Sequence, residues 1–144
     1  MNEFEAPDQP RFTHEEAWAV GQQLVERCLV EGHGVTISIV LGSQRVFHAA
    51  LPGTSADNDE WVARKIAVVR RFDRSSHAVF ELHAKNDPDF LVHFGLTSAE
   101  YAPTGGAVPI RVNGSQVGVL AVSGLDSLSD HNLAIDALTA SART

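Results

Sequence analysis

The sequence predicts a single α/β domain, in which helices alternate with the strands of one sheet. Three observations lead to this fold class. The chain has 144 residues, the length of one ordinary domain. Hydrophobic residues make up 44% and charged residues 20%, a balance typical of globular rather than disordered proteins. Helical and strand-like hydrophobic patterns alternate along the chain, and Asn113-Gly114 is a strong signal for a tight hairpin.

The N-terminal region predicts an arm followed by a helix. Residues 1–12 contain two prolines and no hydrophobic period, so we expect a flexible arm there and one domain over residues 13–144. Thr13 and Glu16 have the spacing of a capping box, in which each side chain satisfies a free backbone amide at a helix start. The helix that follows is expected to end at Gly32.

The rest of the chain predicts strands and helices in alternation. Residues 35–41 carry apolar side chains at every second position, which places Ile37 and Ile39 on one face of a strand and Ser38 on the other. After residue 34 we predict strands at 35–41 and 45–51, a helix at 58–74, a strand at 77–84, a helix at 87–94, a helical turn at 98–101, strands at 107–112 and 115–123, and a final helix capped by Ser129 or Asp130. This order contains five strands.

Charge and composition exclude several classes of protein. The formal net charge of -7 disfavours nucleic acid or an anionic membrane surface as a partner. The N-terminus lacks the pattern of a secretory signal, and no apolar run approaches the roughly 20 residues that span a bilayer, so we expect a cytoplasmic protein. The seven histidines show no metal-binding spacing, and Cys28, the single cysteine, lies on an apolar helical stripe. We therefore predict no metal site and a buried Cys28.

Lys65 is the most informative polar residue, because it shares one helical stripe with Trp61, Val68 and Phe72. A lysine among large apolar side chains either extends its amine to solvent at the edge of the core or anchors an anionic ligand in a pocket. The sequence favours the first arrangement and leaves the second open.

Three short motifs combine a structural role with the potential to bind a ligand. Gly105-Gly106 precedes a strand and Ser123-Gly124 follows one, and glycine there allows a sharp turn or a close approach of a ligand. Asp130-His131 begins the last helix, where Asp130 can cap it. The helix terminus is expected to lower the pKa of His131 and keep its imidazole neutral. The chain carries no complete catalytic signature.

Several motifs in combination resemble a known family. They are Leu51-Pro52-Gly53-Thr54, Asp57-Asn58-Asp59-Glu60-Trp61 with Arg64-Lys65, Arg71-Phe72 with Ser75-Ser76, Phe94-Gly95-Leu96, Gly105-Gly106-Ala107-Val108-Pro109-Ile110, and Val122-Ser123-Gly124-Leu125 with Asp130-His131. The chain resembles, over nearly all of its length after residue 13, the uncharacterised family labelled "heme-degrading domain-containing", a relative of the GlcG/HbpS proteins. The resemblance implies a three-layer α/β/α sandwich with one mainly antiparallel, five-stranded, profilin-like sheet. It also implies a homodimer or a higher oligomer, and it makes heme a candidate cofactor.

The first functional hypothesis is a cytoplasmic oligomer that binds a small anionic ligand, with heme as one candidate. The expected ligand-binding residues are Trp61, Lys65, Gly105, Gly106, Ser123, Asp130 and His131. A second hypothesis is a non-catalytic scaffold in which the same motifs form a subunit interface. A third is an enzyme acting on heme or another small organic acid, with His131 as its acid or base. The sequence leaves open whether there is catalysis.

Overall fold

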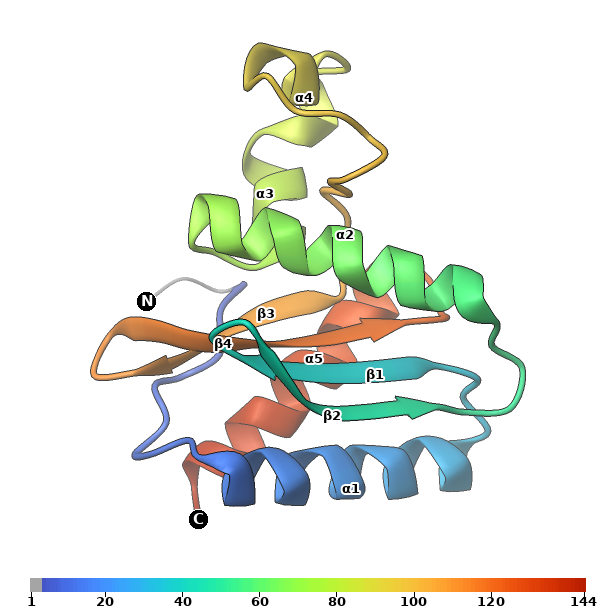
Figure 1. The fold of residues 1–144 in the computed structure, drawn as a ribbon, viewed down its shortest axis with the longest axis vertical. Coiled ribbons are helices and arrows are strands. Elements are labelled where there is room, and N and C mark those ends of the chain that lie inside the picture. Colours follow the sequence, from blue (N-terminus) through green and yellow to red (C-terminus); the bar gives the residue numbers. More distant parts are fainter. Residues whose placement is uncertain (1–3) are drawn as a thin grey trace.

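The computed structural model describes residues 4–144 and shows, within them, one antiparallel sheet of four strands in the order β2-β1-β4-β3 (Figure 1). Helices cover both faces of this sheet. The elements in chain order are α1 (His14–Glu31), β1 (Thr36–Leu41), β2 (Gln44–Ala50), α2 (Ala56–Phe72), α3 (Ser76–Leu82), a 3-10 turn (Ala84–Asn86), α4 (Phe90–His93), β3 (Ala107–Val112), β4 (Ser115–Ser123) and α5 (Ser127–Ala142). The predicted α/β/α layering is therefore present.

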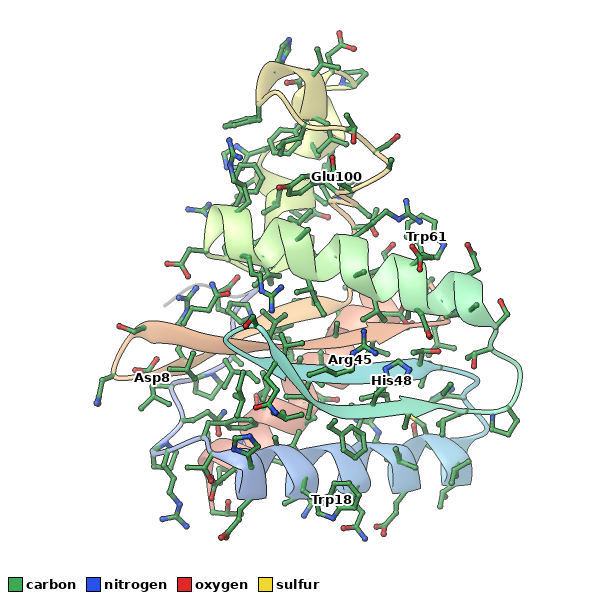
Figure 2. All side chains as sticks on the ribbon, viewed as in Figure 1. Asp8, Trp18, Arg45, His48, Trp61 and Glu100 are labelled. Atoms are coloured by element: carbon green, nitrogen blue, oxygen red, sulfur yellow. The ribbon has the colours of Figure 1, made fainter. Side chains whose placement is uncertain are left out.

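Different helices cover the two faces of the sheet. Helices α1 and α5 lie on one face and α2 on the other, while α3 and α4 stack beyond α2 and project from the body (Figure 1). Strand β4 pairs with both β1 and β3 and is therefore one of the two central strands of the sheet. Trp18 lies on the outer side of α1, whereas Arg45 and His48 lie between β2 and α2 (Figure 2).

The face covered by α1 and α5 holds the larger apolar core. Its buried members include Ile37 and Ile39 of β1, as the alternation predicted, and also Cys28. Most of its other members are branched aliphatic or aromatic side chains: Phe12, Val20, Leu24, Val35, Phe47, Leu51, Val108, Ile110, Leu120, Val122, Leu133 and Leu138. Packing of these side chains at the density of a protein interior stabilises the whole layer.

The face covered by α2 is apolar over a smaller area. Val62, Ile66 and Val69 of α2 pack against Val40 and Val119 of the sheet. Towards the start of α2 the same face becomes polar, because buried Thr36, Ser38 and Ser123 replace the aliphatic side chains there. Residues of this polar part line both of the clefts described below.

The prediction of a strand at residues 77–84 is wrong, since residues 76–82 form helix α3. The hydroxyl of Ser75 accepts a hydrogen bond from the Ala78 amide at 3.0 Å and caps this helix. Ala78 and Val79 are both buried, whereas alternating strand positions would have placed them on opposite faces. Within the described residues the sheet therefore has four strands rather than the five expected.

Local signals at the helix ends had mixed outcomes. The capping box of Thr13 and Glu16 is confirmed, and Gly32 ends α1 in the left-handed conformation with a φ of 74°. The cap of α5 is Asp126, whose carboxylate accepts a hydrogen bond from the Ser129 amide at 2.9 Å. The prediction that Ser129 or Asp130 caps this helix is wrong, and Asp130 instead forms a buried ion pair with Lys65.

The N-terminal arm, where it is described, lies against the body of the protein. Glu5 accepts a hydrogen bond from the amide of Ser75 at 2.8 Å, and Asp8 accepts one from Gly114 at 2.7 Å. The Gln9 side chain donates to the carbonyl of Leu138 at 2.8 Å. Residues 1–3 of the expected arm lie outside the described residues.

None of the helices within residues 4–144 combines the length and apolar character that a bilayer span requires.

Candidate functional site

A cleft of about 280 Å³ opens where the first turns of α2 and α5 meet the end of β4. The two helices supply most of its lining, and the end of β4 and the segment after it supply the rest together with Thr104. Its lining residues are Asp57, Asn58, Trp61, Lys65, Thr104, Ser123, Gly124, Leu125, Ser127 and Asp130. Trp61, Lys65, Ser123 and Asp130, which the sequence predicted as ligand-binding residues, therefore come together in one place.

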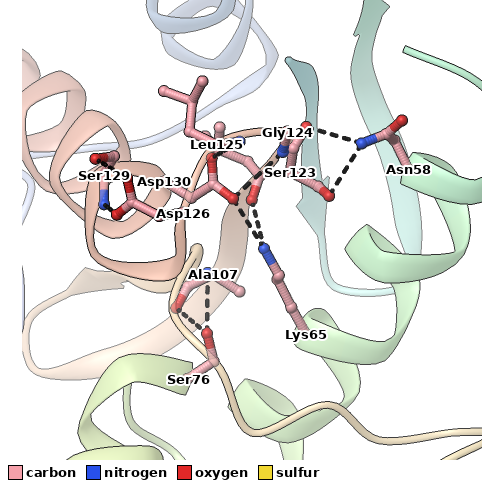
Figure 3. Close-up of polar contacts among 11 residues, drawn as sticks. Asn58, Lys65, Ser76, Ala107, Ser123, Gly124, Leu125, Asp126, Ser129 and Asp130 are labelled. Atoms are coloured by element: carbon pink, nitrogen blue, oxygen red, sulfur yellow. Dashed lines mark hydrogen bonds and ion pairs between the residues drawn. The ribbon is translucent and has the colours of Figure 1, made fainter. Parts of the chain in front are cut away.

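A buried ion pair forms the floor of this cleft (Figure 3). The amine of Lys65 lies 3.2 Å from a carboxylate oxygen of Asp130 and donates to the carbonyl of Val122 at 3.1 Å. Only 4% of Lys65 and 1% of Asp130 are exposed. The favoured prediction for Lys65, an amine extended to solvent at the edge of the core, is therefore wrong.

The backbone after β4 holds the carboxylate of Asp130 in place. Asp130 accepts hydrogen bonds from the amide of Leu125 at 2.9 Å and from that of Gly124 at 3.3 Å (Figure 3). Burial raises the pKa of Asp130, and the charge of Lys65 opposes that rise. Burial likewise lowers the pKa of Lys65, and Asp130 opposes that change. Each charge thus depends on the other.

Asn58 connects the start of α2 to the end of β4. Its side-chain amide donates to the carbonyl and the hydroxyl of Ser123, both at 3.4 Å (Figure 3). Its side-chain oxygen accepts a hydrogen bond from the amide of Ser55 at 3.0 Å, which completes the capping box of α2. One residue therefore fixes both a helix start and a wall of the cleft.

Trp61 forms the side of the cleft on α2. The guanidinium carbon of Arg64 lies 4.1 Å from the centre of its ring, a cation–π distance. Arg64 in turn donates to the carbonyl of Ser98 at 3.3 Å. The indole is thereby held by its own helix and by the segment that leads to Thr104.

Gly105 and Gly106 lie behind the cleft and do not line it. A side chain at Gly105 would collide with the carbonyl of Ser127, and one at Gly106 would come within 2.7 Å of the Lys65 amine. Gly106 also has a φ of 142°, a conformation that favours glycine. The two glycines therefore let β3 start close against α5 and the buried ion pair.

His131 does not line the cleft either, and its side chain lies next to Gly105. Its ring centre is 4.7 Å from that of His77, and Phe4 of the arm packs edge-on against both rings. His131 is 3% exposed. Burial, with a smaller contribution from His77, lowers its pKa to about 4. The lowered pKa agrees with expectation, but its main cause is burial rather than the helix terminus.

Sequence reasoning did not select several residues that line the cleft: Asp57, Asn58, Thr104, Leu125 and Ser127. A local signal existed for Asn58, which stands three residues after Ser55 at a helix start. The others come from the start of α2, from the segment before β3 and from the segment between the end of β4 and the start of α5, and no short motif indicated that these would meet. Within residues 4–144, no group of three or more His, Cys, Asp or Glu side chains is arranged to hold a metal ion.

The arrangement can bind a small polar molecule. A lysine amine has three N–H donors, and two acceptors for that of Lys65 are Val122 and Asp130. The hydroxyls of Thr104, Ser123 and Ser127 add donors and acceptors around the opening. The fold and this cleft together define a small α/β protein with a polar cleft between two helix N-termini and the end of a central strand.

Comparison with known proteins identifies the family. Residues 12–139 match the family described as "Haem degrading protein HbpS-like", and the chain belongs to that family. It is 46% identical to a UPF0303 protein of Rhizobium johnstonii over 123 residues, which cover 85% of this chain and 75% of the relative. It is 41% identical to a UPF0303 protein of Streptomyces coelicolor, with 89% of this chain and 82% of the relative covered.

Solved structures share the same fold. The Ybr137w protein superposes with a TM-score of 0.85 at 29% identity and covers 95% of this chain and 83% of its own. HbpS gives a TM-score of 0.68 at 17% identity, with coverages of 99% and 96%. PduOC in a complex with heme gives 0.70 at 17% identity, with coverages of 90% and 94%. The likeness to the last two concerns the fold alone.

Proposed function

We propose that this protein binds a small molecule with a carboxylate or similar anionic group in the cleft beside Lys65. The observation that carries the proposal is the Lys65 amine, which is buried at the floor of a cleft of about 280 Å³. This amine can donate three hydrogen bonds, and Val122 and Asp130 accept two of them. A ligand oxygen can take the remaining donor direction.

The electrostatics of the walls support an anionic ligand. The first turns of both α2 and α5 line the cleft, and the N-terminus of a helix carries a partial positive charge. The charge of Asp130 is balanced by Lys65 and by two backbone amides. The remaining acidic residue, Asp57, is exposed to solvent, where its charge is screened.

Heme is the ligand that the family description and the PduOC complex make the first to test. The side chains that hold heme iron in proteins are histidine, cysteine, methionine and tyrosine. Among the described residues that line the cleft, none is of these four types. The cleft therefore does not fit a heme, and we propose a smaller ligand for it.

Fluorescence of Trp61 tests the proposal directly. The chain has two tryptophans, so Trp18→Phe leaves Trp61 as the sole reporter, and Trp61→Phe leaves Trp18 on the outer side of α1. We expect small carboxylic acids to give a saturable change in the first variant and none in the second. The matched neutral amides should bind at least ten-fold more weakly. Equal responses from both variants, or equal binding of acids and amides, would contradict the proposal.

A hemin titration of the same proteins separates the two ligand classes. We expect any saturable change in Soret absorbance to be unaffected by Thr104→Val and Ser127→Ala, which alter the cleft but not its buried ion pair. A change lost in both variants would place heme in the cleft and would overturn the assignment of a smaller ligand.

A scaffold remains the second candidate function, and exposed apolar side chains favour it. Leu29 and Val30 on α1 are 55% and 87% exposed, and Val92 and Phe94 near α4 are 72% and 47% exposed. Such side chains are commonly covered in oligomers. Light scattering of the purified protein, with Val30→Glu and Val92→Glu as separate variants, tests whether either surface joins subunits. Loss of an oligomer in one variant, without loss of ligand binding, would separate this role from the cleft.

A further inference from the structure

A second cleft, of about 190 Å³, lies between β1, β2 and α2, at the other side of α2 from the first. Its walls include Ser38 of β1, Arg45 and His48 of β2, and Asp59 and Arg70 of α2. None of these residues lines the cleft proposed above to bind a ligand. The second cleft is thus a separate site with its own set of polar groups.

The strand register brings the polar groups of this cleft together. Ser38 pairs directly opposite His48, so the two side chains are cross-strand neighbours on the α2 face. Between Ile39 and Val40 the register shifts by one residue, which makes Val46 the extra residue of a β-bulge. The bulge returns Arg45 to the face that carries His48, although the two residues are three apart (Figure 2).

A chain of polar contacts runs from the sheet to α2. The hydroxyl of Ser38 lies 2.6 Å from Nδ1 of His48, and Nε2 of His48 lies 3.6 Å from a carboxylate oxygen of Asp59. With the Nε2 proton facing Asp59, Nδ1 is left to accept the serine proton. A nucleophile, a base and a group that orients the base are the parts of a hydrolytic triad. In the usual serine triad Nε2 faces the serine and Nδ1 faces the carboxylate, whereas here Nδ1 faces the serine and Nε2 the carboxylate.

The position of Ser38 is fixed, since β1 is paired on both sides at this residue, with His48 and with Ala121. Ser38 is only 1% exposed, yet its side chain forms part of the wall of the open cleft. The buried residues at the centre of this face of the sheet are aliphatic. A local departure from apolar packing, maintained by a bulge, is typical of a functional site.

We propose that this cleft is a nucleophilic site that cleaves small esters with an anionic acyl group. The Ser38 oxygen forms a bond to the ester carbonyl carbon while its proton passes to Nδ1 of His48. The tetrahedral intermediate then expels the alcohol, which takes that proton. Water, activated by the same imidazole, hydrolyses the acyl-serine and releases the acid. Asp59 acts as a positioning residue for His48.

The two arginines determine the class of substrate. Arg70 donates to the carbonyl of Gly42 at 2.6 Å, which holds its guanidinium beside the cleft. Arg45 is exposed and lines the same wall, where it can meet the developing oxyanion or a carboxylate of the substrate. A volume of about 190 Å³ restricts the acyl group to a small one.

Labelling with a fluorophosphonate probe, followed by peptide mapping, tests the nucleophile without knowledge of the natural ester. We expect one label per chain, at Ser38, and no label in Ser38→Ala. The matched control is Ser43→Ala, which removes another serine from the same cleft and should leave labelling unchanged. Since mapping is done on the natural protein, the test does not depend on the folding of any variant.

The role of the imidazole is tested separately. His48→Ala should slow labelling and the hydrolysis of p-nitrophenyl acetate by about 100-fold or more, the usual contribution of a general base. Added imidazole should restore part of the rate, which a merely structural role would not produce. Asp59→Asn should slow the reaction less. Absence of a label, a label on Ser43 instead, or labelling indifferent to His48→Ala would overturn the proposal.

Discussion

The two faces of the sheet differ in the chemistry of their buried residues. The face under α1 and α5 is filled by one continuous set of aliphatic and aromatic side chains. The face under α2 has a small apolar centre, and beside it lie the Lys65–Asp130 pair in one cleft and the Ser38–His48 contact in the other. Burial of apolar area stabilises a fold, whereas buried polar groups cost free energy unless fully paired. We infer that the first face supplies stability and the second carries the sites.

The largest effect is expected from breaking the buried ion pair. Lys65→Met leaves the carboxylate of Asp130 buried without its cation, which costs about 3–5 kcal/mol. Urea denaturation followed by circular dichroism measures the loss. The double variant Lys65→Met/Asp130→Asn should recover most of it, because the substituted amide is neutral and its oxygen can still accept a hydrogen bond from the Leu125 amide. If the double variant stays as unstable as the single one, the ion pair is a net source of stability. The face under α2 would then stabilise the fold as well, contrary to the inference above.

A cavity on the other face should be nearly as costly. Leu138 of α5 is fully buried in the larger core, so Leu138→Ala should lower the free energy of unfolding by about 2–5 kcal/mol. The same denaturation experiment measures it. The exposed Leu128, which is 53% exposed at the start of the same helix, is the matched control, and Leu128→Ala should change stability by less than about 0.5 kcal/mol. Ligand binding in the first cleft should be unchanged by either substitution.

Local chemistry explains which parts of the fold were predictable. The hairpin at Asn113, the capping box at Thr13 and the end of α1 at Gly32 depend on neighbouring residues, and all three are confirmed. The strand expected at residues 77–84 failed because a short alternating segment also fits a helix, and the Ser75 cap decides between them. Sequence patterns describe such short segments ambiguously.

Long-range contacts explain what the sequence could not predict at the site. Lys65 and Asp130 were each selected, but they are 65 residues apart and no motif indicated that they pair. Gly105 and His131 were grouped with them, although the structure separates these two from the cleft. The contact of Ser38 with His48 depends on the strand register and on the bulge at Val46. A slip of one residue in the pairing of β1 with β2 would abolish this contact.

Acid should destabilise the protein through a third buried polar group, the imidazole of His131. Its pKa is lowered from 6.5 to about 4 by burial, with His77 adding to the shift, so the folded state holds it neutral. A depressed pKa contributes stability that is present above pH 6.5 and is lost as the pH falls towards 4. Unfolding curves across this range should show that fall in the free energy of unfolding.

Replacing the imidazole tests the source of the acid effect. His131→Leu should reduce the slope of stability against pH between 6.5 and 4, since the group that takes up the proton is gone. His14→Ala removes an exposed histidine instead and should leave the slope unchanged. An unchanged slope in His131→Leu would assign the acid sensitivity to other groups.

The smallest effects on stability are expected from the helix caps, one on each face of the sheet. Thr13 caps α1 and Ser55 caps α2, each through a capping box. Replacing either by alanine should cost about 1 kcal/mol. The two variants should nevertheless differ in ligand binding, because the Ser55 hydroxyl that is removed accepts a hydrogen bond from the amide of Asp57, which lines the first cleft. Ser55→Ala should weaken the Trp61 fluorescence response several-fold, while Thr13→Ala should leave it unchanged. Equal responses from the two variants would show that the cleft does not depend on the Ser55 hydroxyl at the start of α2.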